Sequence, residues 1–228
     1  GWGRNPTTRW TPGAIYADHY DVQITQPIAS NSPLSARVYV GFIDPATAET
    51  TNLPLPARDK AGAVITPIIG SVILEPDPAS IPQASEMQPL GSTFGGVIKA
   101  AASSMPLTAS LSSSSVISAS VLWEAVGQPA TNYTGYVHLI DAEGRQKAGF
   151  DRAPARDRFP TAAWRTGDRV LSDFPLQLPE GVTPGHYELW LGVYESASGG
   201  TVALPVSDSG DIPSKDNQIR IGEIEITP

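Results

Sequence analysis

The chain of 228 residues has no cysteine, only four lysines and no run of 18 consecutive apolar residues. Without cysteine it can form neither a disulfide scaffold nor a thiolate metal site, although this leaves its compartment open. Without a bilayer-length apolar run it has no segment that would cross a membrane as a helix. The first ten residues also lack the apolar core of a signal peptide. The sequence therefore predicts a soluble protein or fragment.

The scarcity of basic residues restricts the partners. The formal net charge is -8, whereas nucleic acids and anionic membrane surfaces are bound by dense Lys and Arg. We therefore predict no nucleic-acid partner, and contact with a membrane only through segments outside this sequence.

Short strand-like runs make up most of what is present. Runs rich in Val, Ile, Leu, Tyr and Thr are bounded by Gly, Pro, Asn, Asp or Ser, and helical periodicity is almost absent, which is typical of a β-sandwich. The predicted strands include His19 to Thr25, Ala36 to Ile43, Val116 to Glu124, Tyr133 to Asp141, Val170 to Leu178, Tyr187 to Tyr194 and Gln218 to Ile226.

An internal repeat organises these strands. The motif Pro6, Thr7, Trp10 and Gly13 recurs 154 residues later as Pro160, Thr161, Trp164 and Gly167. Further matches follow at offsets of 151 and 152, pairing Val38, Val40 and Phe42 with Leu189, Leu191 and Val193, and Gly70, Val72 and Leu74 with Gly222, Ile224 and Ile226. The first copy has no counterpart of residues 92 to about 154, so it is incomplete.

The repeat and the proline pattern together define the predicted organisation. We expect an all-β protein of tandem β-sandwich units, jelly-roll or immunoglobulin-like, of which the first is incomplete. Residues 1–75 would form the partial unit and residues 92–228 the complete one. Residues 76–91, rich in proline, would form an extended linker.

The order of motifs in the second copy resembles a known family. These motifs are LWEA at 122–125, YTGYVHLIDAEG at 133–144, the Pro160-Thr161-x-x-Trp164 segment, Pro184-Gly185-x-Tyr187-x-Leu189-x-x-Gly192-x-Tyr194 and the closing strand from Ile219. They are similar to the extracytoplasmic C-terminal β-domains of large multi-spanning bacterial membrane proteins, the family 39-like glycosyltransferases, which use lipid-linked sugars. The resemblance implies an extracytoplasmic location and a non-catalytic domain, because the catalytic acid of such proteins lies in their membrane part.

Most of the repeated residues have an architectural explanation. Pro6 and Pro160 fix φ and cannot occupy a central strand position, so with Thr7 and Thr161 they mark a corner of the chain. Trp10 and Trp164 are expected to fill that corner and seal the core.

The outer face of the strand Tyr187 to Tyr194 offers a candidate glycan site. Trp190 and Tyr194 flank Gly192 there, and such a notch could stack a sugar ring. The structural alternative is that a cross-strand aromatic side chain folds over Gly192. A glycan or glycolipid is the predicted partner.

A second candidate site lies in the segment that carries the Pro-Thr-Trp motif. Its arginines, Arg156, Arg158 and Arg165 foremost, could bind a phosphate or carboxylate group. Aspartates alternate with them, and this pattern equally indicates a loop held by its own ion pairs.

Signatures of catalysis and metal binding are weak. His19, His138 and His186 are isolated, and neither an HExxH nor a GxSxG motif occurs. Asp208, Asp211 and Asp216 share one loop but lack the order of a calcium loop. We predict no catalytic residue, metal or cofactor. A hydrolase would require carboxylates brought together in a groove.

Three functions remain to be distinguished by structure. The first is a non-catalytic extracytoplasmic accessory module of a membrane glycosyltransferase-like protein that contacts glycan or glycolipid. The second is a structural spacer or assembly domain, and the third is the hydrolase.

The apolar face of the incomplete first unit must also be covered by other residues. We expect packing against the second unit, with self-association of chains or an upstream segment as alternatives.

Overall fold

The computed structural model describes residues 9–15, 17, 20–24, 33–43, 54–55, 57–65, 68–76, 81, 87–110 and 116–228. Within these ranges the chain is all-β, as predicted, with short 3-10 helices that include η4 (Arg156–Arg158) and η5 (Thr161–Ala163). No helix in the described ranges is both long and apolar enough to span a membrane.

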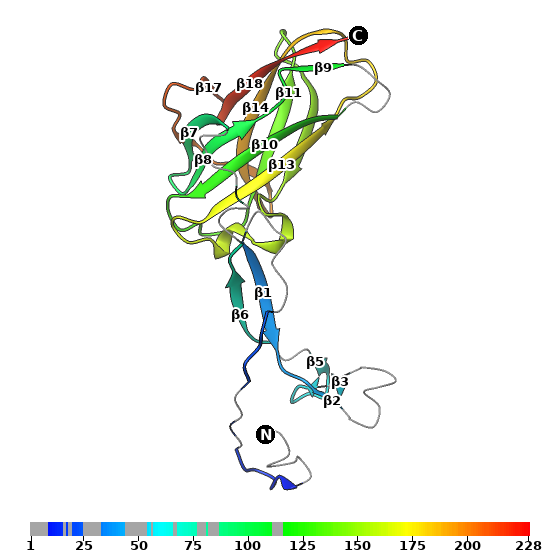
Figure 1. Cartoon of the computed structure of the whole chain (residues 1–228), viewed down its shortest axis with the longest axis vertical. Helices are drawn as coiled ribbons and strands as arrows, with labels where there is room; N and C mark the ends of the chain where they lie inside the picture. The colour runs from blue at the N-terminus through cyan, green and yellow to red at the C-terminus, as the bar shows by residue number, and fades with distance from the viewer. Residues whose placement is uncertain are drawn as a thin grey trace.

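Two sheets packed face to face form the main body (Figure 1). The first has the order β13 (Arg169–Gln177), β10 (Val116–Ala125), β8 (Ile98–Ser104), β7 (Gln88–Phe94) and β16 (Val206–Asp208). The second has the order β12 (Gln146–Arg152), β11 (Tyr133–Ile140), β14 (Gly185–Ala197), β18 (Gln218–Thr227) and β17 (Ser214–Lys215), with β15 (Gly200–Ala203) beside β14 and β9 (Thr108–Ser110) beside β18.

The core between these sheets follows from residue alternation. Leu189, Leu191 and Val193 of β14 have no exposed surface. In β18 the buried residues are Ile219, Ile221, Ile224 and Ile226, and the alternation shifts by one residue between Ile221 and Ile224. Trp123 of β10 packs directly against the opposite sheet, since a Cβ built on Gly135 would lie 3.0 Å from its ring. Its indole N–H donates to Ser172 at 3.0 Å, which satisfies the one polar group of the ring.

The repeated Pro-Thr-Trp segment closes one end of the sandwich. Trp164 is completely buried, stacks on Phe159 and donates its indole N–H to the Phe159 carbonyl at 3.1 Å. The Thr161 hydroxyl accepts the backbone N–H of Tyr133 and donates to the carbonyl of Thr131. This segment therefore fixes the start of β11 as well as filling the corner. Pro6 and Thr7 lie outside the described residues, and Trp10 is 37% exposed.

The described residues before 88 form three two-stranded pairs. They are β1 (Leu34–Tyr39) with β6 (Ile68–Leu74), β2 (Phe42–Ile43) with β3 (Pro54–Leu55), and β4 (Ala57–Arg58) with β5 (Val64–Ile65). The first strand of the sandwich is β7, which begins at Gln88, inside the range 76–91 predicted as a linker.

The β1–β6 pair has the same pairing as β14–β18. Val38 lies opposite Gly70 in the first pair, and Leu189 lies opposite Gly222 in the second. Each pair has one bulge, which directly follows Val38 in the first and Leu189 in the second. The residues aligned by the sequence repeat therefore occupy equivalent strand positions and share a local distortion.

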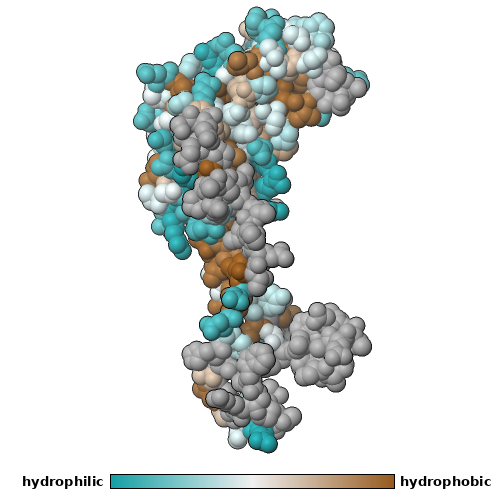
Figure 2. All heavy atoms as spheres, viewed as in Figure 1, coloured by the Kyte–Doolittle hydropathy of each residue, from teal (hydrophilic) through white to brown (hydrophobic). Residues whose placement is uncertain are grey.

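The surroundings of the two pairs differ. The described part of the first unit includes no second sheet over β1 and β6, and Val40 and Val72 are 43% and 45% exposed. Figure 2 shows apolar atoms gathered on this part of the molecule, just below the sandwich. Ile73 does contact the sandwich core. We expected the second unit to cover the apolar residues of the first. This is wrong for Val40 and Val72, because the sandwich contacts only the end of the β1–β6 pair that lies nearest to it.

The strand predicted at His19 to Thr25 is not found in its described part, residues 20–24. Its repeat equivalent, β13, pairs with β10. No described strand pairs with residues 20–24, so their backbone N–H and C=O groups form no ladder in the described structure. The other predicted strands of the second copy match β10, β11, β13, β14 and β18 to within three residues at either end.

The contribution of Trp164 to stability can be compared with that of Trp10, the equivalent residue in the first copy of the repeat. We expect Trp164→Ala to cost about 3–5 kcal/mol, because it removes a fully buried indole and leaves a cavity. At roughly 2–4 °C per kcal/mol this lowers Tm by roughly 6–20 °C in calorimetry. The matched control is Trp10→Ala, for which we expect less than half that change. Equal decreases would contradict the different packing of the two rings.

Candidate functional site

Strand β14 presents an aromatic row on the outer face of the seven-stranded sheet. Trp190 and Tyr194 point outward because they alternate with the buried Leu189, Leu191 and Val193. In β11 the residues opposite are His138 across from Trp190 and Tyr136 across from Gly192. The tertiary structure thus adds two rings to the pair predicted from the sequence.

The notch above Gly192 is filled by protein. A Cβ built on Gly192 would lie 2.2 Å from the Tyr136 hydroxyl oxygen and ring, so the Tyr136 side chain occupies that space. Tyr136 is only 7% exposed, and its ring centroid lies 5.9 Å from that of Tyr194. The Tyr194 hydroxyl donates to Asp151 at 3.1 Å. The cross-strand arrangement considered above as the structural alternative is the one present, and no sugar enters the notch itself.

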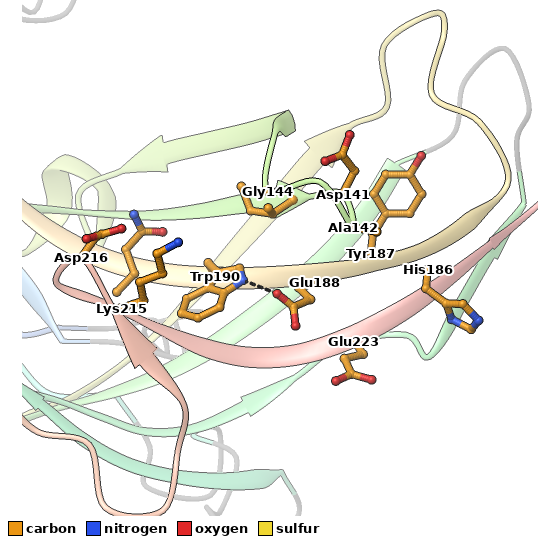
Figure 3. Close-up of a pocket in the computed structure, with 12 residues that line it drawn as sticks. Asp141, Ala142, Gly144, His186, Tyr187, Glu188, Trp190, Lys215, Asp216 and Glu223 are labelled. Carbon is orange, nitrogen blue, oxygen red and sulfur yellow. Dashed lines mark hydrogen bonds between the residues drawn. The ribbon is translucent and has the colours of Figure 1, made fainter.

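Trp190 instead borders a pocket of about 450 Å³ on the same face (Figure 3). The pocket lies between the β11–β12 turn and strands β14, β17 and β18. It is lined by Ile140, Asp141, Ala142, Gly144, His186, Tyr187, Glu188, Trp190, Lys215, Asp216, Gln218 and Glu223. This volume is within the range of small-ligand sites.

A chain of polar contacts fixes the Trp190 ring. The indole N–H donates to one oxygen of Glu188 at 3.0 Å, and the other Glu188 oxygen accepts from Arg220 at 2.7 Å. Arg220 also pairs with Glu223 at 2.7 Å. Burial acts to raise the pKa of Glu188, but the hydrogen bonds from Arg220 and Trp190 outweigh it and lower the pKa. Glu188 therefore stays ionised and holds the indole plane in one orientation.

The β11–β12 turn forms the pocket wall through Asp141. Its carboxylate accepts the backbone N–H groups of Glu143 and Arg145, and the side chains of Arg145 and Lys147 also bind it. Burial acts to raise the pKa of Asp141, but these contacts prevail and hold the pKa well below its usual range. The turn is thus held by a charged carboxylate at all but strongly acidic pH.

The predicted anion-binding arginines lie on a different part of the molecule, the segment with η4 and η5. Arg156 and Arg158 lie on η4 and Arg165 follows η5, and all three are exposed. Arg156 has φ of 56°, and its charge acts together with burial to lower the pKa of Arg152. The backbone N–H of Arg165 donates to Asp168 at 2.7 Å, which helps to shape the loop.

The candidate metal ligands do not assemble. No group of three or more His, Asp or Glu side chains that could hold a metal ion occurs in the described ranges, which contain Asp208, Asp211 and Asp216. One Asp208 oxygen accepts the backbone N–H of Gly210 at 2.9 Å, a local turn contact.

We expect Gly192→Ala to destabilise the fold by about 1–3 kcal/mol, because the new methyl group would overlap the Tyr136 ring. The matched control is Gly70→Ala, at a strand position with no atom within 4 Å of the added Cβ. Its effect should be at most about 0.5 kcal/mol in the destabilising direction. Urea unfolding measures both. Equal losses would contradict the placement of the Tyr136 ring.

His138 gives the sheet a testable pH dependence. Burial lowers the pKa of His138, and nearby Asp151 offsets this only in part. Since the folded pKa lies below the unfolded value of about 6.5, stability falls as pH drops through and below that value. We expect the decrease in Tm from pH 7.5 to pH 5 to be smaller in His138→Gln than in the unmodified chain. The same decrease in both would show that His138 does not contribute.

Comparisons with known proteins add little to this description. No protein-family model matches the chain, and no curated protein matches it. A solved structure described as "Crystal structure of the C-terminal domain of wzt" aligns with 62% of this chain and 81% of its own, at 12% identity and a TM-score of 0.43. So distant a likeness concerns the fold alone and carries no argument about function.

Proposed function

We propose that the chain is a non-catalytic glycan-binding module and that Trp190 is the ring on which the sugar stacks. The observation that carries this proposal is the pocket beside Trp190, where a partly exposed indole is held by Glu188 next to carboxylate, amide and ammonium groups. A sugar ring has C–H faces that pack on an aromatic ring and hydroxyl groups that need hydrogen-bond partners. This pocket supplies both.

The charge of the pocket lining favours a neutral glycan. The lining contains the carboxylates of Asp141, Glu188, Asp216 and Glu223 and the ammonium group of Lys215. The nearby cations Arg145, Lys147 and Arg220 are already paired with Asp141, Glu188 and Glu223. A sulfated or carboxylated sugar would therefore have to compete with these carboxylates for a cation. Carboxylates also accept hydrogen bonds from the hydroxyl groups of a neutral sugar.

The aromatic row supports a ligand longer than one sugar. Trp190 and Tyr194 lie on one face of β14, four residues apart, which corresponds to roughly 13 Å along a strand. Both side chains are partly exposed. A short oligosaccharide laid along β14 would contact both rings, with Tyr136 filling the space between them.

We further propose an extracytoplasmic location and a role as an accessory domain of a membrane glycosyltransferase-like protein. The support is the motif order of the second copy described above. Its recurring residues serve the architecture, as Thr161 and Trp164 do in fixing the corner beside β11. No catalytic residue is assigned to the domain, and binding is its proposed contribution.

Exposed apolar side chains on and beside the β1–β6 strand pair favour a second candidate function. Val40, Ile68, Ile69 and Val72 are each at least 43% exposed, and an apolar patch of this kind is typical of a protein interface. On this alternative the chain is a spacer or assembly domain, and the Trp190 pocket binds no glycan.

The two functions differ in the effect of Trp190→Ala. For a glycan module we expect binding to neutral oligosaccharides on an array to weaken roughly 30-fold or more, a typical loss for a Trp anchor. The decrease in Tm should be less than half that of Trp164→Ala, because the ring is partly exposed. Trp10→Ala is the control and should retain binding. No binding by the unmodified chain would leave the assembly role as the supported function.

A further inference from the structure

A second cavity of about 560 Å³ opens where the two sheets separate at their edges. One side comes from β7 and β8, and the other from β18 and the loop before β17. Its lining consists of Met87, Gln88, Ser103, Ser104, Met105, Leu107, Ile212, Pro213, Arg220, Ile221, Gly222 and Glu223. It lies along the edge of β18 that faces away from β14.

The cavity exists because the edge of β18 is covered only at its two ends in the described structure. Strand β17 pairs with β18 at Gln218 and Ile219, and β9 pairs with it from Glu225 onward. The backbone N–H of Arg220 donates to Pro213, and that of Glu225 donates to Leu107. No described strand pairs with this edge over residues 221–224, which leaves a gap between the two short strands.

The interior of the cavity is apolar and adaptable. It contains Met87 and Met105, the two methionines of the chain. The Met105 sulfur lies over Gly222, where an added Cβ would be 2.3 Å from it. Unbranched thioether side chains adapt to flexible apolar ligands. Ile212 and Ile221 complete this apolar surface, and the exposed lining residues include Leu107 and Pro213 as well as the polar Gln88, Ser104 and Glu223.

The cavity adjoins the Trp190 pocket. Glu223 lines both, and Arg220 lines the cavity while binding Glu188, which holds the Trp190 indole. A single molecule could therefore place a polar head at Trp190 and an apolar tail beyond Arg220. The strongly polar contacts lie between the two sites, where the head and tail of an amphiphile would join.

We propose that this cavity binds the alkyl chain of a neutral glycolipid whose sugar lies on Trp190. The assignment of the head rests on the proposed function, whereas the assignment of the chain rests on the cavity alone. The two methionines beside Arg220, at the gap in the edge of β18, carry the inference.

Methionine-methyl NMR tests it directly, because Met87 and Met105 each give one methyl signal and both line the cavity. The probes are hexyl, heptyl and octyl β-glucoside, each below its critical micelle concentration, and free glucose. We expect the alkyl glucosides to shift both methyl signals and free glucose to shift only the Trp190 indole signal. Each added methylene should tighten binding roughly fourfold, the fold-change that corresponds to about 0.8 kcal/mol.

A blocking variant locates the chain. Ser104→Trp places a ring at the cavity mouth, and Ser118→Trp places the same ring at an exposed position of β10 away from the cavity. We expect Ser104→Trp to abolish the chain-length dependence and retain the indole shift with glucose, and Ser118→Trp to behave as the unmodified chain.

Three results would overturn the inference. They are unchanged methionine signals with every alkyl glucoside, affinity independent of chain length, and equal behaviour of the two variants. Methionine shifts and a chain-length dependence without any response of Trp190 would support the cavity as an alkyl site and refute the proposed sugar site. The two proposals therefore fail separately.

Discussion

The alternation of strand β14 is the constraint on which both the fold and the candidate site depend. Leu189, Leu191 and Val193 are fixed between the two sheets, so Trp190 and Tyr194 must lie on the outer face. A shift in register by one residue would exchange these faces and bury a charged carboxylate, Glu188, in the core. The hydrophobic core therefore also orients the aromatic row and the contact from Trp190 to Glu188.

The two copies of the repeat show what a strand pair gains from its surroundings. β1–β6 and β14–β18 share register and bulge, so the local pairing follows from the sequence in both. Met105 fills the space over Gly222, whereas nothing lies within 4 Å of a Cβ at Gly70. The described residues of the first unit include no side chain in the corresponding place. Equal pairing thus leads to a buried face in one copy and an exposed face in the other.

The Trp190 pocket and the second cavity both adjoin the β-bulge between strands β14 and β18. The bulge between Leu189 and Trp190 places Gly222 under Met105 and Arg220 beside Trp190. Bulges redirect side chains and interrupt pairing. The Arg220 side chain can thereby bind Glu188 and Glu223 on one side while lining the cavity on the other. The proposed sugar and alkyl sites are two consequences of one local distortion.

The sequence by itself determined the all-β class, the main strands of the second copy and the outward position of Trp190, because a period of two assigns faces without knowledge of partners. It did not predict β7 and β8, whose Gly-, Ala- and Ser-rich segments carry weak strand signals. Only the tertiary structure decided that Tyr136 fills the notch at Gly192 and that Glu188, Arg220 and Glu223 converge near Trp190. These contacts depend on register between strands distant in sequence, and residue periodicity along one strand contains no information about that register.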